Sequence, residues 1–264
     1  MTPSACAPVG NAKTLRNDNS SRFGKFVDIT FSETGTVISG AVCTYLLEKS
    51  RAVSIPSGER SFHIFYQLLA RPEGMLRRAA LAEAQTPEPF PSLEGSLTLL
   101  GEHGDACTTV SSIDDSADGE ALEAALRTLG LSDDELSSLY HALSATLLCS
   151  NLNLGAGNPG EGDACVEDSP TLLAVAQQLG VLAPALAAAL TKQRLKMGGE
   201  MVTSPRTIDQ ASRVRHALAK AVFAGTFRFL VSRINRPLEG RDESSCGVSI
   251  GVLDVRLLAL THEP

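Results

Sequence analysis

The sequence contains no tryptophan, and aromatic residues make up only 5% of its 264 residues. It has six cysteines but no C-x-x-C pair, and no histidine stands at zinc-finger spacing from them. Widely separated cysteines of this kind are typical of reduced, mostly buried thiols rather than of a metal site. They are Cys6, Cys43, Cys107, Cys149, Cys165 and Cys246.

An excess of basic charge is also missing, because the formal net charge is −7 at pH 7. Nucleic acids and anionic membranes usually bind clusters of lysine and arginine, so the negative net charge argues against either as a general partner. A local basic patch is still possible. Residues 1–16 have neither the basic stretch nor the apolar stretch of a secretory signal. These absences favour a cytoplasmic protein.

The chain lacks an uninterrupted hydrophobic run of membrane-spanning length. Its longest uncharged stretch, residues 169–191, is long enough, but Gln177, Gln178, Gly180 and Pro184 interrupt it. We therefore expect two short soluble helices on either side of Gly180. Hydrophobic residues make up 43% of the chain and charged residues 20%, which is typical of a soluble globular protein with a buried core.

Two neighbouring segments predict an antiparallel hairpin. Apolar and polar side chains alternate with the period of a strand in residues 26–31, and residues 36–44 are rich in strand-forming types. Gly35 in the turn between them supplies the positive φ that short hairpin loops need. A third strand is predicted at residues 249–255, whose apolar run is typical of a buried central strand. A sheet this small would leave at least one edge open.

Helices are predicted at three places. Residues 62–69 are apolar and aromatic, and a proline soon after them disfavours further helix. Ser132 and Glu135 form a capping box ahead of leucines at helical spacing. Residues 207–234 carry apolar side chains every three or four positions, which predicts a long helix that Pro237 ends.

The segments at 86–118 and 153–168 are rich in glycine, proline and polar residues, which predicts loops. The five histidines are scattered over unrelated segments and favour structural roles. The adjacent carboxylates at 114–115 and 133–134 favour helix capping and solvent contact over acid–base chemistry. The expected architecture is mostly α-helical with a small, incomplete sheet of about three strands.

The polar segment at residues 10–26 carries the clearest candidate chemistry. It gathers Asn, Asp, Ser and Arg in a predicted loop directly before the first strand, where backbone amides and hydroxyls can meet phosphate. Ser20 and Ser21 offer hard oxygen ligands to Mg²⁺, and Arg22 offers a fixed positive charge. The same composition also suits an ordinary polar turn that caps a strand, so spacing alone leaves both interpretations open.

A series of stretches, taken in order, resembles the motor domain of myosins. The similarity begins with NDNSSRFGKF, which resembles switch I, and continues with TYLLEKSR and GERSFHIFYQLL, which resemble the strand and helix after it. The match goes on through LGLSDDEL, ALTKQRLKMGGE, QASRVRHALAK and IGVLDV. The resemblance runs from about Pro8 to Val255 and implies an α/β fold of the P-loop NTPase type.

The resemblance implies roles for the residues of this segment. Asn17, Asn19 and Ser20 would touch or shape the pocket for the ATP phosphates, and Ser21 would ligate Mg²⁺. Arg22 would form the ion pair that closes the pocket behind the γ-phosphate. In such sites positioning and charge neutralisation carry most of the catalysis.

Two departures from the family pattern limit this expectation. The P-loop motif G-x-x-x-x-G-K-S/T is absent, so we expect the chain to begin after it. Asp254 matches the start of switch II and would hold the Mg²⁺ shell through water, but Leu257 and Ala259 replace the glycine and the glutamate that follow in the family. Arg22 is therefore expected to lack its ion-pair partner.

Residues 194–206 resemble a surface loop that approaches actin in the family. Arg194, Lys196 and Arg206 are the candidate contacts with the acidic filament. A solvated connection between two helices explains the same composition equally well.

The predicted function is that of a partial actin-based motor head of the cytoskeleton, one that does not hydrolyse ATP as an isolated chain. We expect residues 1–16 to be an N-terminal remnant, residues 17–258 the partial motor domain, and residues 259–264 a tail outside the family register. The other motor segments and any light chains would not be encoded here. The alternative is a non-catalytic module that binds actin or another motor chain.

Overall fold

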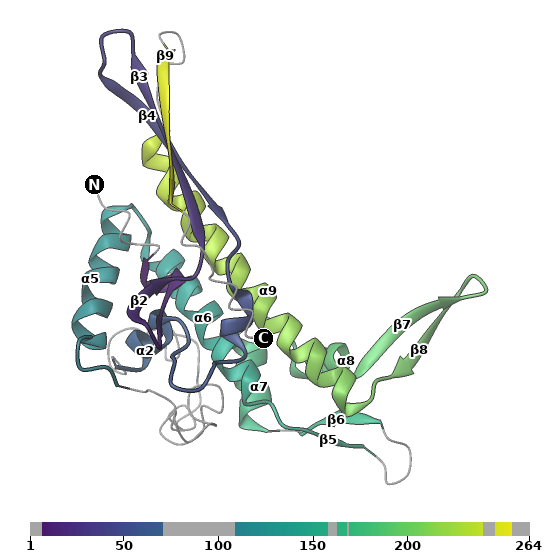
Figure 1. Ribbon diagram of the computed structural model, residues 1–264. Coiled ribbons are helices and arrows are strands. Elements are labelled where there is room, and N and C mark those ends of the chain that lie inside the picture. Colours follow the sequence, from purple (N-terminus) through teal and green to yellow (C-terminus); the bar gives the residue numbers. More distant parts are fainter. Residues whose placement is uncertain (1–6, 71–108, 158–162, 168, 240–245, 255–264) are drawn as a thin grey trace, which may run out of the picture.

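A computed structural model of the chain describes residues 7–70, 109–157, 163–167, 169–239 and 246–254. Three antiparallel strands form a sheet at one end of the molecule, in the order β4-β3-β9 (Figure 1). The strands are β3 (Gly24–Ser32), β4 (Val37–Tyr45) and β9 (Cys246–Asp254). The predicted hairpin of β3 and β4 is confirmed, and Gly35 in its turn has a φ of 79°.

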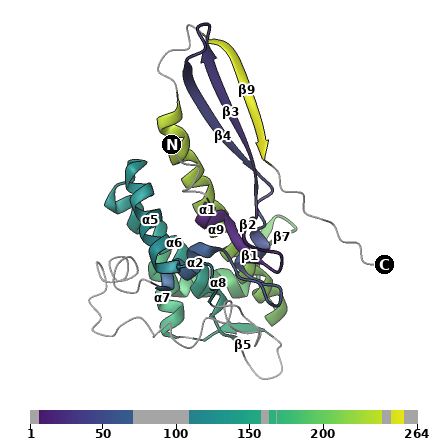
Figure 2. The ribbon, with the colours of Figure 1, turned by 60° about the vertical axis from the view of Figure 1, so that its left-hand side comes forward.

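The prediction of a buried central strand at residues 249–255 is wrong in its placement. β9 lies at the edge of the sheet and pairs with β3, which is the central strand (Figure 2). All of its residues from Val248 to Asp254 are exposed, and the side chains of Val248 and Leu253 are 65% and 63% exposed. An apolar composition made the strand predictable, whereas its place in the sheet depends on which strands stand beside it. Its free edge agrees with the open edge expected of a small sheet.

A long helix, α9 (Ile208–Asn235), runs diagonally from the sheet to the opposite end of the protein (Figure 1). Its first turn is stabilised by a capping box between Thr207 and Gln210. A short 3-10 helix, η4 (Arg236–Leu238), follows it and contains Pro237. The predicted long helix and its end at the proline are confirmed.

The main core lies between α9 and the helices α2 (His63–Ala70), α5 (Asp115–Thr128) and α6 (Asp133–Ser150). The Phe62 ring stacks on Phe223 at 4.5 Å, which brings α2 against α9. The predictions of α2 and of the capping box at Ser132 are confirmed. The predicted stop of this helix near residue 71 lies outside the described residues.

Helix α5 corrects the prediction that residues 86–118 form a loop, because the helix already begins at Asp115. The carboxylate of Asp114 accepts hydrogen bonds from the backbone amides of Ser116 and Ala117 and so caps the helix. Leu122 and Leu126 are buried in the core. Residues 86–108 lie outside the described residues.

Two short helices, α7 (Pro170–Gln178) and α8 (Ala183–Thr191), stand on either side of Gly180, whose φ is 65°. This confirms the prediction for residues 169–191. Within the described residues no single helix has the length and hydropathy to cross a membrane, although α7 and α8, bent by 99°, meet that condition as a pair. Both helices bury apolar side chains in a second core cluster with Ala219 of α9.

Six short hairpin strands and two short helices complete the described chain. The predicted loop at 153–168 contains a hairpin of β5 (Leu154–Ala156) and β6 (Ala164–Val166), and the predicted connection at 194–206 is a hairpin of β7 (Lys192–Met197) and β8 (Glu200–Pro205). Both loop predictions are therefore wrong in part, because cross-strand backbone hydrogen bonds form between segments of polar composition. The others are α1 (Ala7–Gly10), β1 (Asn11–Thr14), β2 (Asn17–Ser21) and η2 (Lys49–Ala52).

The expectation of mostly buried thiols holds for only part of the set. Cys149 is buried in α6, but Cys43 is exposed on β4 and Cys165 is half-buried on β6. None of these three thiols forms a disulfide. Cys43 is exposed because its side chain lies on the face of β4 opposite to that of Val42, which packs against the main core.

Candidate functional site

The polar segment before the sheet forms a β-hairpin, which corrects the prediction of a loop. Strand β1 pairs with β2, and the hydroxyl of Thr14 closes the turn by donating to the carbonyl of Asn17 at 3.1 Å and accepting from its amide at 3.1 Å. At the base of the hairpin, the Phe23 ring packs edge-on against Phe227 of α9 at 5.0 Å. The hairpin is therefore anchored to the core at one end and carries polar side chains along its length.

Two side-chain amides of this hairpin, those of Asn17 and Asn19, have engaged acceptors and free donors. The Oδ1 atom of Asn19 accepts from Nδ2 of Asn11 at 2.8 Å, and the Oδ1 atom of Asn17 accepts from the backbone amide of Asn19 at 2.8 Å. The Nδ2 groups of Asn17 and Asn19 have no partner among the described residues. Donors left free in this way suit an anion such as phosphate.

The two adjacent serines differ in their surroundings. Ser20 is 7% exposed, and its hydroxyl accepts a hydrogen bond from Nη1 of Arg22 at 3.2 Å. Ser21 is half-buried, and the part of the chain that the structure describes offers its hydroxyl no partner. Ser21 is thus the serine whose oxygen is available to a ligand.

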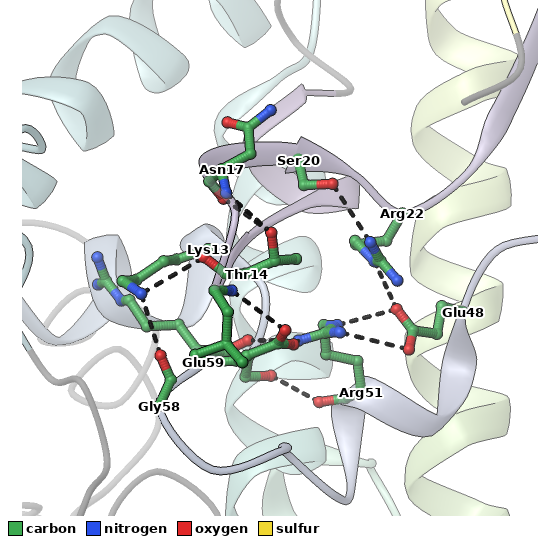
Figure 3. A network of polar contacts seen from close by, with 12 residues as sticks. Lys13, Thr14, Asn17, Ser20, Arg22, Glu48, Arg51, Gly58 and Glu59 are labelled. Atoms are coloured by element: carbon green, nitrogen blue, oxygen red, sulfur yellow. Dashed lines mark hydrogen bonds and ion pairs between the residues drawn. The ribbon is translucent and has the colours of Figure 1, made fainter. Parts of the chain in front are cut away.

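Arg22 forms an ion pair with Glu48, a partner that the sequence did not indicate, while the expected loss of its family partner concerns position 259, which lies outside the described residues. Its Nε atom lies 2.6 Å from Oε2 of Glu48, and the Arg22 side chain is 14% exposed (Figure 3). The backbone amide of Glu48 also donates to the carbonyl of Arg22 at 2.9 Å. Leu46, two residues before Glu48, has a φ of 53°, a left-handed conformation that costs a leucine about 1–2 kcal/mol. The chain turns at this residue on its way to Glu48.

The Glu48 carboxylate is held in its ionised form. Burial alone would raise the pKa of Glu48, but hydrogen bonds from Arg51 and Arg22 and the charges of these arginines outweigh burial and lower it below its ordinary value. The Nε atom of Arg51 lies 2.9 Å from the same Glu48 oxygen that Arg22 contacts. A carboxylate shared by two guanidinium groups ties β2 to the helix η2.

Asp254 stands at the end of β9, directly opposite Lys25 of β3, and its Oδ2 atom lies 3.1 Å from the Lys25 ammonium. The Asp254 side chain is 55% exposed. The strand pairing thus places Asp254 beside the start of β3, and β3 begins three residues after Ser21. In this structure the partner of the Asp254 carboxylate is Lys25. Residues 257 and 259 lie outside the described residues.

Among the residues that the structure describes, no group of three or more His, Cys, Asp or Glu side chains is arranged to hold a metal. A hard cation at this hairpin would therefore depend on a hydroxyl, a single carboxylate, water and the oxygens of a ligand. Mg²⁺ at phosphate sites is commonly bound in that way.

The β7–β8 hairpin separates the three candidate actin contacts. Arg194 and Lys196 are exposed on β7, which projects from the body of the protein (Figure 1). Arg206 instead turns back, and its Nη1 atom donates to the carbonyls of Ala189 at 2.9 Å and of Lys192. Arg206 therefore caps the end of α8, and Arg194 and Lys196 remain as the exposed pair among the three candidates.

Comparison with known protein families identifies the family of this chain. The sequence profile of the family described as myosin head (motor domain) matches residues 5–258. The chain belongs to the myosin head family.

Individual myosins are similar to the chain over nearly all of its length. Unconventional myosin-Ic of Danio rerio is 38% identical over 250 residues, covering 93% of this chain and 23% of that relative. Unconventional myosin-Ic of Bos taurus is 39% identical over 251 residues, covering 93% and 22%, and unconventional myosin-Ih of Mus musculus is 38% identical over 246 residues, covering 93% and 24%. The chain therefore spans less than a quarter of these relatives and corresponds to a partial myosin motor domain.

Sequence reasoning missed three charged residues of this myosin head segment, namely Glu48, Arg51 and Glu59. Two of them lie in the stretch TYLLEKSR, and Glu59 lies in GERSFHIFYQLL. Spacing does not reveal them, because Glu48 lies 26 positions from its partner Arg22. Glu48 and Glu59 contact the β1–β2 hairpin, and Arg51 is linked to it through them, only because the folded chain brings residues 48–59 back beside it.

Proposed function

We propose that this chain supplies the phosphate-sensing hairpin and the upper helical lobe of a myosin head that uses ATP and Mg²⁺ to move on actin. The observation that supports this proposal best is the β1–β2 hairpin itself. Its Asn17 and Asn19 amides have free donors, its Ser21 hydroxyl is available, and Arg22 supplies a fixed positive charge beside them. The family to which the chain belongs implies the nucleotide and the metal.

Each residue has a distinct task in this proposal. The Nδ2 groups of Asn17 and Asn19 donate hydrogen bonds to phosphate oxygens, while Ser21 presents its oxygen to Mg²⁺. Ser20 is buried beneath Arg22 and orients that guanidinium. Bound Mg²⁺·ATP would supply the reactive phosphoryl group together with most of the charge neutralisation.

Asp254 would hold the water shell of Mg²⁺, and Lys25 determines when its carboxylate is available. In the present structure the Asp254 carboxylate is engaged by the Lys25 ammonium. A surface ion pair of this kind contributes only about 0–1 kcal/mol. A dication can therefore displace Lys25 at little cost.

The isolated chain is not expected to hydrolyse ATP. Its sequence has no G-x-x-x-x-G-K-S/T motif, whose backbone amides and lysine hold the phosphates in the P-loop enzymes. Magnesium-dependent hydrolysis by the purified chain, lost in Ser21→Ala, would contradict this expectation.

The phosphate-sensing role can be tested by transplanting residues 7–254 into the matching segment of the Danio rerio relative. The chimaera is expected to hydrolyse ATP, and Ser21→Ala is expected to lower its rate at least about tenfold, since a metal ligand is lost. The matched control is Ser138→Ala, which alters an exposed serine of α6. A chimaera that hydrolyses ATP equally well with and without Ser21→Ala would refute the assignment of this hairpin.

Actin binding is supported by the exposed cations of β7. The double change Arg194→Glu and Lys196→Glu is expected to weaken co-sedimentation of the chain with actin filaments at low salt, because an acidic filament then meets like charge. Arg228→Glu, an exposed charge reversal on α9, serves as the control. Equal loss of binding in both variants would show that net charge matters and this hairpin does not.

A non-catalytic interaction module is the second candidate, and the projecting β7–β8 hairpin favours it. Such a module would bind filaments or another motor chain through the same exposed cations, without any response to Ser21→Ala in the chimaera. Either function places the protein with the actin cytoskeleton in the cytoplasm.

A further inference from the structure

Arg51 lies in η2, is only 3% exposed, and binds two carboxylates at once. Its Nε atom is 2.9 Å from Glu48, and its Nη1 atom is 2.7 Å from Glu59. The same Nη1 group donates to the carbonyl of Arg60 at 3.0 Å. A planar guanidinium is suited to this arrangement because its five donors point in fixed directions.

The two carboxylates reach opposite ends of the β1–β2 hairpin. Glu48 contacts Arg22, the residue directly after β2, at 2.6 Å. Glu59 accepts a hydrogen bond from the backbone amide of Leu15, in the turn between the strands, at 3.3 Å. Figure 3 shows Arg51 between these two glutamates, with the hairpin above them. One buried side chain is thereby connected to both the turn and the base of the hairpin.

The four side chains alternate in charge along the path Arg22, Glu48, Arg51, Glu59, and their formal charges sum to zero. A buried ion pair is costly to break, because removal of one partner leaves the other charge without compensation. Loss of Arg51 would leave Glu48 with Arg22 alone and Glu59 with only the weaker amide contact of Leu15. Both ends of the hairpin would then lose their common attachment.

We propose that Arg51 is a positioning residue that fixes both ends of the β1–β2 hairpin through Glu48 and Glu59. In doing so it determines where Asn17, Asn19 and Ser21 stand relative to a bound phosphate. The significance of this position rests on the proposed phosphate-sensing function, but the attachment itself requires no nucleotide. Arg51 makes no contact with the ligand and acts only through the two glutamates.

Another mostly buried arginine provides a matched control. The Nη2 atom of Arg233 on α9 lies 2.6 Å from Glu135 and donates to the carbonyl of Gly130 at 3.0 Å. It has a side-chain exposure of 11%, pairs with a carboxylate and joins two helices, but it does not touch the hairpin. Arg233→Met therefore reproduces the loss of a buried ion pair without the proposed positioning effect.

The test is amide hydrogen exchange of the full 264-residue chain, followed residue by residue by NMR. Arg51→Met is expected to raise exchange at least about tenfold at both Leu15 and Arg22, while the amides of β3 and β4 keep the rates of the parent chain. Arg51→Lys is expected to restore part of the protection, because an ammonium can still bind one carboxylate. Arg233→Met is expected to leave the hairpin amides at the parent rates.

The glutamates separate the two ends. Glu59→Gln should raise exchange at Leu15 alone, and Glu48→Gln should raise it at Arg22 alone, since each removes one attachment. These two variants decide the question if Arg51→Met does not fold. Exchange that rises equally at both ends in either glutamine variant, or an Arg51→Met chain whose hairpin is as protected as the parent, would overturn the proposal.

Failure of the proposed function gives a different result. A chimaera indifferent to Ser21→Ala, combined with end-specific exchange, refutes the phosphate-sensing function and supports the attachment by Arg51. A chimaera sensitive to Ser21→Ala, combined with unchanged exchange in Arg51→Met, refutes the attachment alone.

Discussion

The side-chain amide of Asn235 completes the outer edge of β4 at Val42. Its Oδ1 atom accepts from the Val42 amide at 2.7 Å, and its Nδ2 group donates to the Val42 carbonyl at 2.9 Å. The two residues lie 193 positions apart in the chain. The backbone amide and carbonyl of Val42 point away from β3, and the side chain of Asn235 binds them as a neighbouring strand would. Because Asn235 is the last residue of α9, this contact attaches the long helix to the sheet.

We expect Asn235→Ala to lower the free energy of unfolding by about 2 kcal/mol, because two partly buried backbone groups lose their hydrogen bonds. Urea denaturation measures this change. The control is Asn153→Ala, which removes an exposed amide contact with Glu167 and should cost less than about 0.5 kcal/mol. Equal costs for the two variants would show that Asn235 does not support the edge of β4.

Two glycine substitutions are expected to have opposite effects on stability. A Cβ atom added to Gly251 of β9 would lie 2.4 Å from the Phe26 ring of β3, so Gly251→Ala should cost about 1–3 kcal/mol. Gly225 lies inside α9 with nothing within 4 Å of an added Cβ, so Gly225→Ala should stabilise the chain by roughly 0.5–1 kcal/mol. Urea denaturation of both variants provides the comparison, and a stabilising Gly251→Ala would contradict the packing of Phe26 over β9.

His63 is expected to make the protein less stable as the pH falls. Burial, followed by the charge of Arg60, lowers the pKa of His63 to about 4 from its ordinary value of 6.5, although Asp18 acts in the opposite direction. Between these two pH values His63 is protonated in the unfolded chain but neutral in the folded chain, so protonation favours unfolding. The contribution of neutral His63 to the free energy of unfolding is therefore full above pH 6.5 and is lost as the pH falls toward 4. The full loss amounts to roughly 3 kcal/mol.

The measurement is urea denaturation of the parent and of His63→Gln at about pH 7 and about pH 5. Stability should fall by roughly 2 kcal/mol less in His63→Gln than in the parent over this interval, because the titrating group is gone. An unchanged pH dependence in His63→Gln would exclude this histidine as the source.

The described thiols are expected to differ sharply in reactivity. Burial raises the pKa of the Cys149 thiol to about 12, although Arg215 acts in the opposite direction, and the reactive thiolate is therefore scarce. Cys43 is exposed on β4 and should be alkylated by iodoacetamide in the folded chain before Cys149 reacts measurably. Peptide mass spectrometry measures the extent of alkylation at Cys43 and at Cys149. In denaturant both thiols should be alkylated. Rapid alkylation of Cys149 in the folded chain would contradict its burial in α6.

The helices that could be predicted are those whose signals lie within a few residues. The capping box of Ser132 and Glu135 and the apolar spacing of residues 207–234 identified α6 and α9, because a helix forms hydrogen bonds between near neighbours. Helix α5 was missed, although Asp114 is an ordinary capping residue, because the polar composition around it also suits a loop. Local patterns therefore predicted elements well where capping and apolar spacing agreed.

The candidate site was predictable in its residues but not in its connections. The run from Asn17 to Arg22 was recognisable from the sequence, whereas the hairpin form of that run and its link to Glu48 were not. An ion pair between segments far apart in the chain leaves no periodic signal. The expectation for Arg22 considered only the family position at Ala259, which lies outside the described residues, and so it did not include Glu48.

The sequence by itself determined the family, the main helices, the strands β3, β4 and β9, and the polar segment that carries the candidate chemistry. These features depend on side-chain types at short spacings, which the chain displays directly. Tertiary structure alone decided that β9 lies at an open edge, that Arg206 caps α8 while Arg194 and Lys196 stay exposed, and that Arg51 links Glu48 to Glu59. Each of these features depends on which distant segments come into contact. Burial of side chains and pairing of charges decide those contacts, and both arise only in the folded chain.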